Sequence, residues 1–399
     1  EGDTAIVLGG NTLTTNQTET VVAGEGKTIT ITDGNLNATA STDPLRSILQ
    51  ATAGGTIELN DVEFTTNATG LLAMGEDATL RIVNSTVKAF AFCVSTNAGG
   101  EENYYPNIEI VDSVLMTTNT NKDGCTGTAV LFNVPGSLSI ENSTVIGECG
   151  AVFVRGGDAV IRNSTLSRPY EVVGASESNI YMDGTWASGN QAPLATLLVG
   201  NRSASAYQYP ANVTLENCTI TASDDGAKTV YLYGNAAEEN GATLTYDAAT
   251  VISPKDEAVA PVIVGGGKVT VNGASYVTPP AGSTTITQTE LHDMLNDAST
   301  SAKVLAADAE ITEDMNVYTD STFDLGGNTI TSSQTMTLGR TNDYASAPVE
   351  IEMGNGTYVV SDGNSGRIRF EDSCSGTFRD MTFASDTGSL REAIQVCRE

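Results

Sequence analysis

The acidic residues are the first place to look for chemistry in this chain. Asp224 and Asp225 are adjacent and precede Gly226, and paired carboxylates can act as general acid and base in glycoside hydrolysis. They fall in a predicted turn, however, where a solvated pair is the simpler interpretation. The single histidine, His292, lies on a predicted helix rather than beside this pair. We therefore predict that the chain has no catalytic residues and is not an enzyme.

Cofactor and nucleic-acid chemistry have little support in the sequence. The chain has no glycine-rich phosphate loop, no Cys-x-x-Cys pair, no nucleophile elbow and no histidine-rich metal spacing. Its 49 acidic and 19 basic residues give a formal charge of −30, which disfavours nucleic acid and anionic membrane surfaces as partners. We expect no cofactor. A solvated extracellular or high-salt surface explains the acidity, and calcium binding is the alternative explanation.

Several features favour an extracellular or cell-surface location. No run of about 18 apolar residues is present, so we expect no membrane insertion. No basic-then-apolar leader opens the sequence, as expected of a processed chain. Six cysteines suit an oxidising compartment. Of the ten Asn-x-Ser/Thr sequons, six are candidate glycosylation sites: Asn16, Asn37, Asn67, Asn201, Asn212 and Asn355.

The other four sequons belong to a repeat that organises the chain. Residues 138–145 read LSIENSTV, and variants return at residues 57–64, 80–87, 108–115, 159–166, 213–220, 244–251 and 269–276, with a looser copy at 180–187. Alternating apolar residues predict a strand with one buried face, and the fifth position predicts a left-handed turn. We expect one interior file formed by Leu80, Ile108, Leu138, Val213, Leu244 and Val269. We expect a ladder of turn residues at one corner: Asn84, Asp112, Asn142, Asn163 and Asn217.

The spacing between copies, roughly 26 residues, predicts a solenoid, because a unit of this size cannot bury its apolar face alone. A second apolar run between copies gives each coil at least two strands, which stack in parallel on the next coil. The pattern restarts near residue 283. A capping box at Thr287–Glu290 opens a helix near 288–297, and residues 323–331 (FDLGGNTIT) repeat residues 8–14 (LGGNTLT). We therefore predict a β-helix module at 1–282 and a second, partial module at 283–399.

These coils resemble right-handed parallel β-helix proteins of the pectate-lyase-like fold. The helix and the LGGNTIT stretch resemble the cap and first coil of adhesin-like extracellular surface proteins. The resemblance covers nearly the whole chain and implies an all-β solenoid with a short capping helix. This fold carries lyases, hydrolases, tailspikes, adhesins and structural fibres, so it does not by itself determine the function.

The enzymatic alternative is a polysaccharide lyase or glycoside hydrolase. Hydrolases of this fold resemble one another in paired aspartates with a Gly-His-Gly stretch, and the chain has no such stretch. The lyases use Arg or Lys as a base near calcium-binding acids. Arg155, Arg162 and Arg168 could line one face for this purpose, yet no acidic calcium cluster accompanies them. We interpret these arginines as surface charge.

Two cysteine pairs have the spacing of neighbouring coils. Cys125 with Cys149, and Cys374 with Cys397, are each separated by about one coil. Each pair is therefore a candidate disulfide between adjacent turns of the solenoid, and buried thiols that pack as small apolar residues are the alternative.

Four tyrosines lie in two of the longest polar loops. Tyr104, Tyr105, Tyr207 and Tyr209 form a candidate glycan-contact loop, because insertions in solenoids tend to project from one side and bind ligands. Packing of the tyrosines within their own loops is the alternative.

We expect a secreted structural or adhesive β-helix protein. The sequence opens at a first coil without a cap and stops part-way into a second module. The open coil near Cys374–Cys397 is therefore expected to dock on the open coil near Ile6–Leu13 of the next copy, giving a head-to-tail homopolymer or filament. Glycans or a host or cell surface are further partners. The alternative is that the chain forms part of a repetitive cell-surface adhesin.

Overall fold

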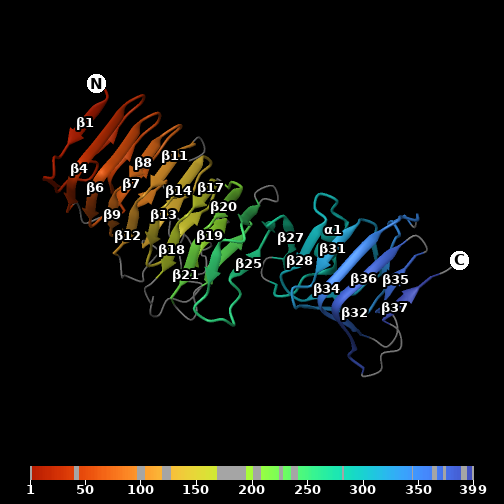
Figure 1. Cartoon of the computed structure of the whole chain (residues 1–399). Coiled ribbons are helices and arrows are strands. Elements are labelled where there is room, and N and C mark those ends of the chain that lie inside the picture. Colours follow the sequence, from red (N-terminus) through yellow and green to blue (C-terminus); the bar gives the residue numbers. More distant parts are fainter. Residues whose placement is uncertain are drawn as a thin grey trace. The chain divides into compact units, whose positions relative to one another are not determined.

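The computed structural model describes most of the chain as two compact units (Figure 1). The described residues are 2–39, 45–96, 104–118, 127–168, 195–200, 208–223, 228–234, 241–280, 283–343, 345–361, 366–371, 374–387 and 393–397. The first unit comprises residues 1–263 and the second comprises residues 264–399. Short strands build both units, and the α-helix of the described residues lies in the second.

The first unit is a parallel β-helix in which a typical coil contributes three strands. Two of these strands meet at a corner in one long sheet, and the third lies in a second sheet. The strands that lead into the corner are β1 (Thr4–Val7), β8 (Thr79–Val83), β11 (Asn107–Val111), β14 (Ser137–Glu141), β17 (Gly157–Arg162), β20 (Ala211–Glu216) and β23 (Ala242–Tyr246). The strands that leave it are β2 (Thr12–Thr15), β9 (Thr86–Ala89), β12 (Val114–Thr117), β15 (Thr144–Ile146), β18 (Thr165–Arg168), β21 (Thr219–Ala222) and β24 (Val251–Ser253). Two longer strands run through it, β4 (Thr28–Ala38) and β6 (Thr56–Thr66).

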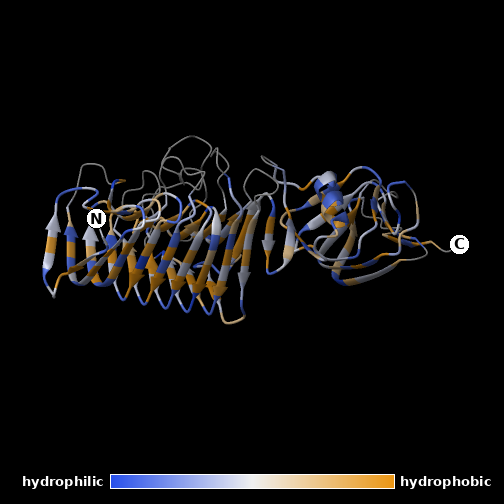
Figure 2. Ribbon diagram, turned by 90° about the horizontal axis from the view of Figure 1, so that it is seen from above, coloured by the Kyte–Doolittle hydropathy of each residue, from blue (hydrophilic) through white to orange (hydrophobic). Residues whose placement is uncertain are grey.

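The interior file predicted from the repeat is confirmed within this unit. Leu80 pairs with Ile108 and Ile108 with Leu138, while Val213 pairs with Leu244 further along. All five are at most 2% exposed. The sixth predicted member, Val269, lies in the second unit. Figure 2 shows hydrophobic and hydrophilic residues alternating along these strands, as expected where one face of a strand is buried and the other is wet.

The second sheet of the first unit is buried on both faces along its middle strands. Its strands are β3 (Val21–Ala23), β5 (Ser47–Ala51), β7 (Thr69–Ala73), β10 (Val94–Ser95), β13 (Thr128–Phe132), β16 (Gly150–Val154), β19 (Ala195–Gly200) and β22 (Lys228–Tyr233). Leu131, Phe153, Leu198 and Tyr231 stack in register and belong to a separate apolar cluster of this sheet. Such continuous apolar runs are typical of parallel strands covered on both sides.

The second unit begins within β25 (Val262–Gly266) and contains the predicted helix. Its remaining elements are β26 (Val269–Val271), β27 (Ala274–Val277), α1 (Gln288–Asn296), β28 (Ala302–Leu305), β29 (Ala309–Ile311), β30 (Met315–Val317), β31 (Ser321–Asp324), β32 (Thr329–Ser332), β33 (Met336–Leu338), β34 (Glu350–Val360), β35 (Ile368–Phe370), β36 (Ser375–Ser385) and β37 (Ile394–Val396).

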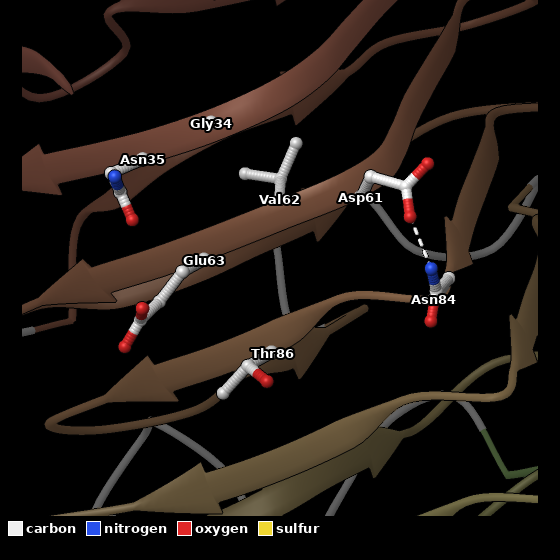
Figure 3. A pocket seen from close by; sticks show the side chains of 7 residues that line it. All are labelled: Gly34, Asn35, Asp61, Val62, Glu63, Asn84 and Thr86. Atoms are coloured by element: carbon white, nitrogen blue, oxygen red, sulfur yellow. Dashed lines mark hydrogen bonds between the residues drawn. The ribbon is translucent and has the colours of Figure 1, made fainter. Parts of the chain in front are cut away.

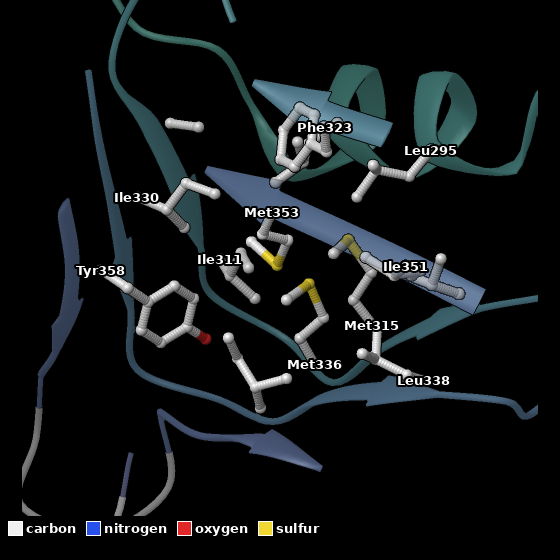
Figure 4. Packing of buried hydrophobic residues seen from close by; sticks show 14 of the residues in the cluster. Leu295, Ile311, Met315, Phe323, Ile330, Met336, Leu338, Ile351, Met353 and Tyr358 are labelled. Atoms are coloured by element: carbon white, nitrogen blue, oxygen red, sulfur yellow. The ribbon is translucent and has the colours of Figure 1, made fainter. Parts of the chain in front are cut away.

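Helix α1 covers one end of the core of this unit. The Glu290 carboxylate accepts the backbone N–H of Thr287 at 3.2 Å, as the capping box predicts. Leu291 and Leu295 are buried, and α1 packs against β27, β29 and β30. At the other end of the helix, the buried Lys303 ammonium donates to the Leu295 carbonyl at 3.2 Å, where a positive charge is favourable. Figure 4 shows Leu295 beside the apolar residues that fill this core.

The two units share one corner structure, which confirms the repeat between residues 8–14 and 325–331. In the first unit the Asn11 side chain donates to the Leu8 carbonyl at 2.8 Å. In the second, Asn328 donates to the Leu325 carbonyl at 3.0 Å. The glycine that faces each corner has no room for a side chain. A Cβ on Gly34 would lie 2.6 Å from the Asn11 carbonyl oxygen, and a Cβ on its counterpart in β34, Gly356, would lie 2.6 Å from the Asn328 carbonyl oxygen.

The boundary between the units lies earlier than the sequence indicates. The predicted division at 282/283 is wrong, because the structure divides the chain after Ile263. Asn272 and Gly273 both have left-handed backbone angles and form the turn of an antiparallel hairpin between β26 and β27. The second strand of that hairpin pairs in parallel with β28, so the hairpin belongs to the first coil of the second unit.

Candidate binding surface at the corner of the first unit

The ladder of turn residues predicted from the sequence forms the corner of the long sheet. All of its members have a left-handed backbone with φ between 45° and 52°: Asn84, Asp112, Asn142, Asn163 and Asn217. Asp33 and Asp61 adopt the same conformation in the preceding coils. Asn and Asp tolerate this conformation better than other residues with side chains, which explains their choice at this position. The predicted corner ladder is therefore confirmed.

A second ladder, of serines, lies directly beneath the corner. It consists of Ser85, Ser113, Ser143 and Ser164, each at most 4% exposed. Each hydroxyl donates to the carbonyl two residues earlier, at 2.6 to 2.7 Å. Each also accepts a backbone N–H from the coil before it, as Ser143 does from Ser113 at 3.1 Å. The serine ladder therefore satisfies backbone groups that the left-handed turn would leave without partners.

Cys218 takes the next place in the serine ladder. Its thiol lies 3.4 Å from the Glu216 carbonyl, two residues earlier, and 3.2 Å from the carbonyl of Ile161. Burial is the main reason that the pKa of this thiol is raised. The Asn-Cys-Thr and Asn-Ser-Thr sequences therefore have one structural cause. The Asn forms the left-handed turn, and the side chain of the small middle residue makes hydrogen bonds to buried backbone groups. The Thr begins the next strand with its side chain outward.

Side chains on either side of the corner line a shallow, open hollow of about 350 Å³ on the first coils (Figure 3). Asp61 and Asn84 line one side, and their side chains are hydrogen-bonded to one another. Asn35, Glu63 and Thr86 line the other side, from consecutive coils in register. Figure 3 shows these three side chains in one row, apart from the Asp61–Asn84 pair. The hollow thus offers amide, hydroxyl and carboxylate groups to a ligand.

The row that begins in the hollow continues along the whole unit. After Asn35, Glu63 and Thr86, its register positions are Val114, Thr144, Thr165, Thr219 and Val251. We call this set the outer row, and we call the outer row together with the corner ladder the corner surface. The outer row could have been found in the sequence, because Thr recurs two residues after the Asn of each sequon in the repeat.

Ion pairs neutralise much of the charge beside the corner surface. Arg81 contacts Glu109 at 2.8 Å, Lys88 contacts Glu63 at 3.2 Å, and Arg162 contacts Glu216 at 2.7 Å. The hydrogen bonds between Arg162 and Glu216 raise the pKa of the arginine and lower that of the carboxyl. These exposed pairs add little to stability, but they leave the neighbourhood less acidic than the net charge suggests.

The tyrosines proposed for glycan contact do not belong to the corner surface. Tyr104 and Tyr105 precede β11, and Tyr209 precedes β20, so they lie at the opposite end of these strands from the corner. Tyr105 is about half exposed, whereas Tyr104 and Tyr209 are partly buried. Tyr207 lies outside the described residues. A role for these residues in glycan contact remains a prediction.

The candidate glycosylation sites divide into two kinds. Asn16, Asn37 and Asn67 are exposed and remain candidate acceptors. Asn355 instead has a left-handed backbone at the corner of β34, so it belongs with the sequons of the turn position. The Asn212 side chain donates to Asp158 at 2.8 Å. Asn201 lies outside the described residues.

The predicted disulfide between Cys374 and Cys397 is absent, and both thiols are free. The register explains why, because β35 pairs with β37 so that Glu371, three residues before Cys374, falls opposite Cys397. The Cys374 thiol instead lies 3.3 Å from the Leu338 carbonyl. Cys149 is buried, and its predicted partner Cys125 lies outside the described residues, so that pairing remains a prediction.

The three arginines considered for a lyase do not share an exposed face. Arg155 and Arg168 are fully buried, so their interpretation as surface charge is wrong. Arg168 occupies a register position equivalent to Ala222 and donates to the Glu148 carbonyl at 2.9 Å. Arg162 is partly exposed and paired with Glu216. The alternation along β18, where Leu166 is buried, already indicates that Arg168 points inward. Arg155 instead follows a strand that is buried throughout, so its direction is known only from the structure.

Acid–base and metal chemistry have few candidates in the part of the chain that the structure describes. Asp224 and Asp225 lie outside it. His292 contacts Asp293 at 3.1 Å on α1 in the second unit. Burial raises the pKa of the Glu148 carboxyl to about 7, and this residue is 4% exposed. Within the described ranges, no three His, Cys, Asp or Glu residues gather as a metal site would require, and no helix there could span a membrane.

The chain matches no protein-family model and no curated protein.

Proposed function

We propose that this chain is a secreted structural or adhesive β-helix protein of the cell surface, whose coils join end to end into a filament. The observation that supports it is a difference between two equivalent coils. In the second unit, β31 and β32 pair with β28 and β29 on one side and with β34 on the other. In the first unit, the equivalent strands β1 and β2 pair with β4 and with no other described strand. An unpaired parallel edge is a template for another strand.

Strand β36 in the second unit has the complementary edge. It pairs with β34 along its whole length and with no other strand among the described residues. Nearby, Val396 in β37 is 68% exposed, and Val7 in β1 is 69% exposed. Stacking of another coil would cover both kinds of surface, strand edges and apolar side chains.

The corner provides a register for such a contact. Phe378 lies two residues before the left-handed Asp380, and Phe383 lies three residues after it. In the first coil, Ile6 and Leu13 take the equivalent positions, because they pair with Ile31 and Leu36 of β4. Placing β36 of one copy beside β1 and β2 of the next would stack Phe378 on Ile6 and Phe383 on Leu13. Repetition of this heterologous contact gives a filament.

Multi-angle light scattering and electron microscopy of residues 1–399 test the proposal. We expect a molar mass that increases with protein concentration, and unbranched filaments at high concentration. A protein that remains monomeric at high concentration would refute self-association. The chain would then be better explained as part of a repetitive adhesin whose neighbouring coils belong to the same polypeptide.

A proline variant tests whether the edge of β1 makes the contact. The Leu8 N–H bonds the Thr32 carbonyl of β4, and backbone groups alternate in direction along a strand, so the Val7 N–H points to the unpaired side. Val7→Pro removes that donor while keeping the bonds to β4. We expect it to abolish filaments without loss of fold. Val7→Thr keeps the donor and serves as the matched control. Filaments of Val7→Pro would show that another surface carries the contact.

A further inference from the structure

We infer that the corner surface of the first unit binds an uncharged, hydroxyl-rich polysaccharide that lies along the solenoid axis. This inference rests on the adhesive part of the proposed function and names its ligand class. It starts from the hollow of Figure 3, where amide and hydroxyl groups of consecutive coils face one open space. Sugar hydroxyls both donate and accept hydrogen bonds, and Asn and Thr side chains can meet either need.

The same pair of groups recurs beyond the hollow. Three consecutive coils carry an Asn in the corner ladder and a Thr in the outer row: Asn142 with Thr144, Asn163 with Thr165, and Asn217 with Thr219. Neighbouring coils are spaced by ~4.8 Å, so the outer row from Thr86 to Thr219 extends over roughly 20 Å. A ligand that contacts several coils must therefore be long and repetitive, which is a property of a linear polysaccharide.

The two rows are already ordered before a ligand binds. The left-handed ladder residues are fixed from below by the serine ladder, and the Asn217 side chain donates to the Asn163 side chain at 2.9 Å. The outer row lies on paired strands whose backbone is held on both sides. Because few side chains must lose freedom on binding, many weak hydrogen bonds can add to a useful affinity.

The charges select a neutral ligand. The three Asn–Thr coils have no ionisable side chain in either row, and the carboxylates in the hollow are bonded to neighbours, Asp61 to Asn84 and Glu63 to Lys88. The chain as a whole has a formal charge of −30. This negative charge repels acidic polysaccharides, whereas it does not affect the binding of neutral ones.

Affinity electrophoresis tests the inference on protein made in a bacterial host that leaves sequons unmodified. Gels contain dextran, mannan, xyloglucan or hydroxyethylcellulose as neutral glycans, and polygalacturonate or alginate as acidic ones. We expect retardation by at least one neutral glycan and none by the acidic glycans. The double variant Thr165→Val, Thr219→Val should bind at least tenfold more weakly. Valine occupies the outer row naturally at Val114 and Val251, so the fold should be retained.

A matched control uses two threonines that face outward on strands that lead into the corner. Thr214 and Thr245 are neighbours in register, and Val160 already occupies the same row. Thr214→Val, Thr245→Val should bind as the unmodified protein does. Equal loss in both double variants, no loss in either, or no retardation by any neutral glycan would overturn the inference. Filament formation is measured separately, so a protein that polymerises without binding glycans would refute this inference alone.

Discussion

The serine ladder allows a sharp test of how the corner is stabilised. In Ser143→Ala, the Ser113 N–H loses its acceptor at 3.1 Å, and the Glu141 carbonyl loses a donor at 2.7 Å. Ser143 is 3% exposed, so water cannot easily replace these partners. A buried polar group left without a partner costs roughly 1–3 kcal/mol, and we expect a loss of about 2 kcal/mol in the free energy of unfolding.

A cysteine at the same position should avoid most of this loss. Cys218 occupies the serine ladder naturally, with its thiol 3.4 Å from the carbonyl two residues earlier. Ser143→Cys should therefore be less destabilising than Ser143→Ala. Ser139→Ala is the control, since Ser139 lies on the outward face of the same coil, and it should change stability by less than about 0.5 kcal/mol.

Two measurements check this prediction. Urea denaturation gives the change in stability of the three variants, and amide hydrogen exchange reports on the Ser113 N–H directly. That amide should exchange faster in Ser143→Ala and at nearly the original rate in Ser143→Cys. If Ser143→Ala leaves both the stability and the Ser113 exchange rate unchanged, the serine ladder does not hold the corner.

Three further predictions concern pH, packing and catalysis. The raised pKa of Glu148 means that the fold favours its protonated form, so the stability it contributes is complete below its ordinary value of 4.5 and is lost as pH rises through about 7. The loss should not exceed ~3 kcal/mol, and urea denaturation between pH 4.5 and 8 should show a weaker dependence in Glu148→Gln. Gly34→Ala and Gly356→Ala should each destabilise their unit by roughly 1–3 kcal/mol, because the added Cβ would overlap corner atoms of the neighbouring coil. Gly24→Ala is the control: its Cβ would meet no atom within 4 Å, so it should be nearly neutral in the same urea denaturation. Purified protein should release no unsaturated or reducing ends from polygalacturonate or alginate; release that disappears in Asp224→Asn, Asp225→Asn would contradict the non-enzymatic interpretation.

The sequence by itself determined the parallel coils, the interior file and the corner ladder. These features depend on local properties that every copy repeats: alternation of apolar residues, and the tolerance of Asn84 or Asn142 for a left-handed backbone. The capping box of α1 and the two LGGN corners also depend on local sequence, so they could be predicted as well. The serine ladder is also visible in the sequence, because Ser or Cys follows the Asn of every sequon in the repeat.

The tertiary structure decided what depends on the phase between coils. Cys374 and Cys397 are one coil apart in sequence, but pairing between β35 and β37 places Glu371 opposite Cys397. Arg155 is buried and Asn355 lies at a corner, although Arg155 follows a strand without alternation and the copies of the repeat do not include Asn355. Turns of variable length reset both register and facing direction, so the sequence specifies each strand while only the stacked coils determine which residues of different strands meet.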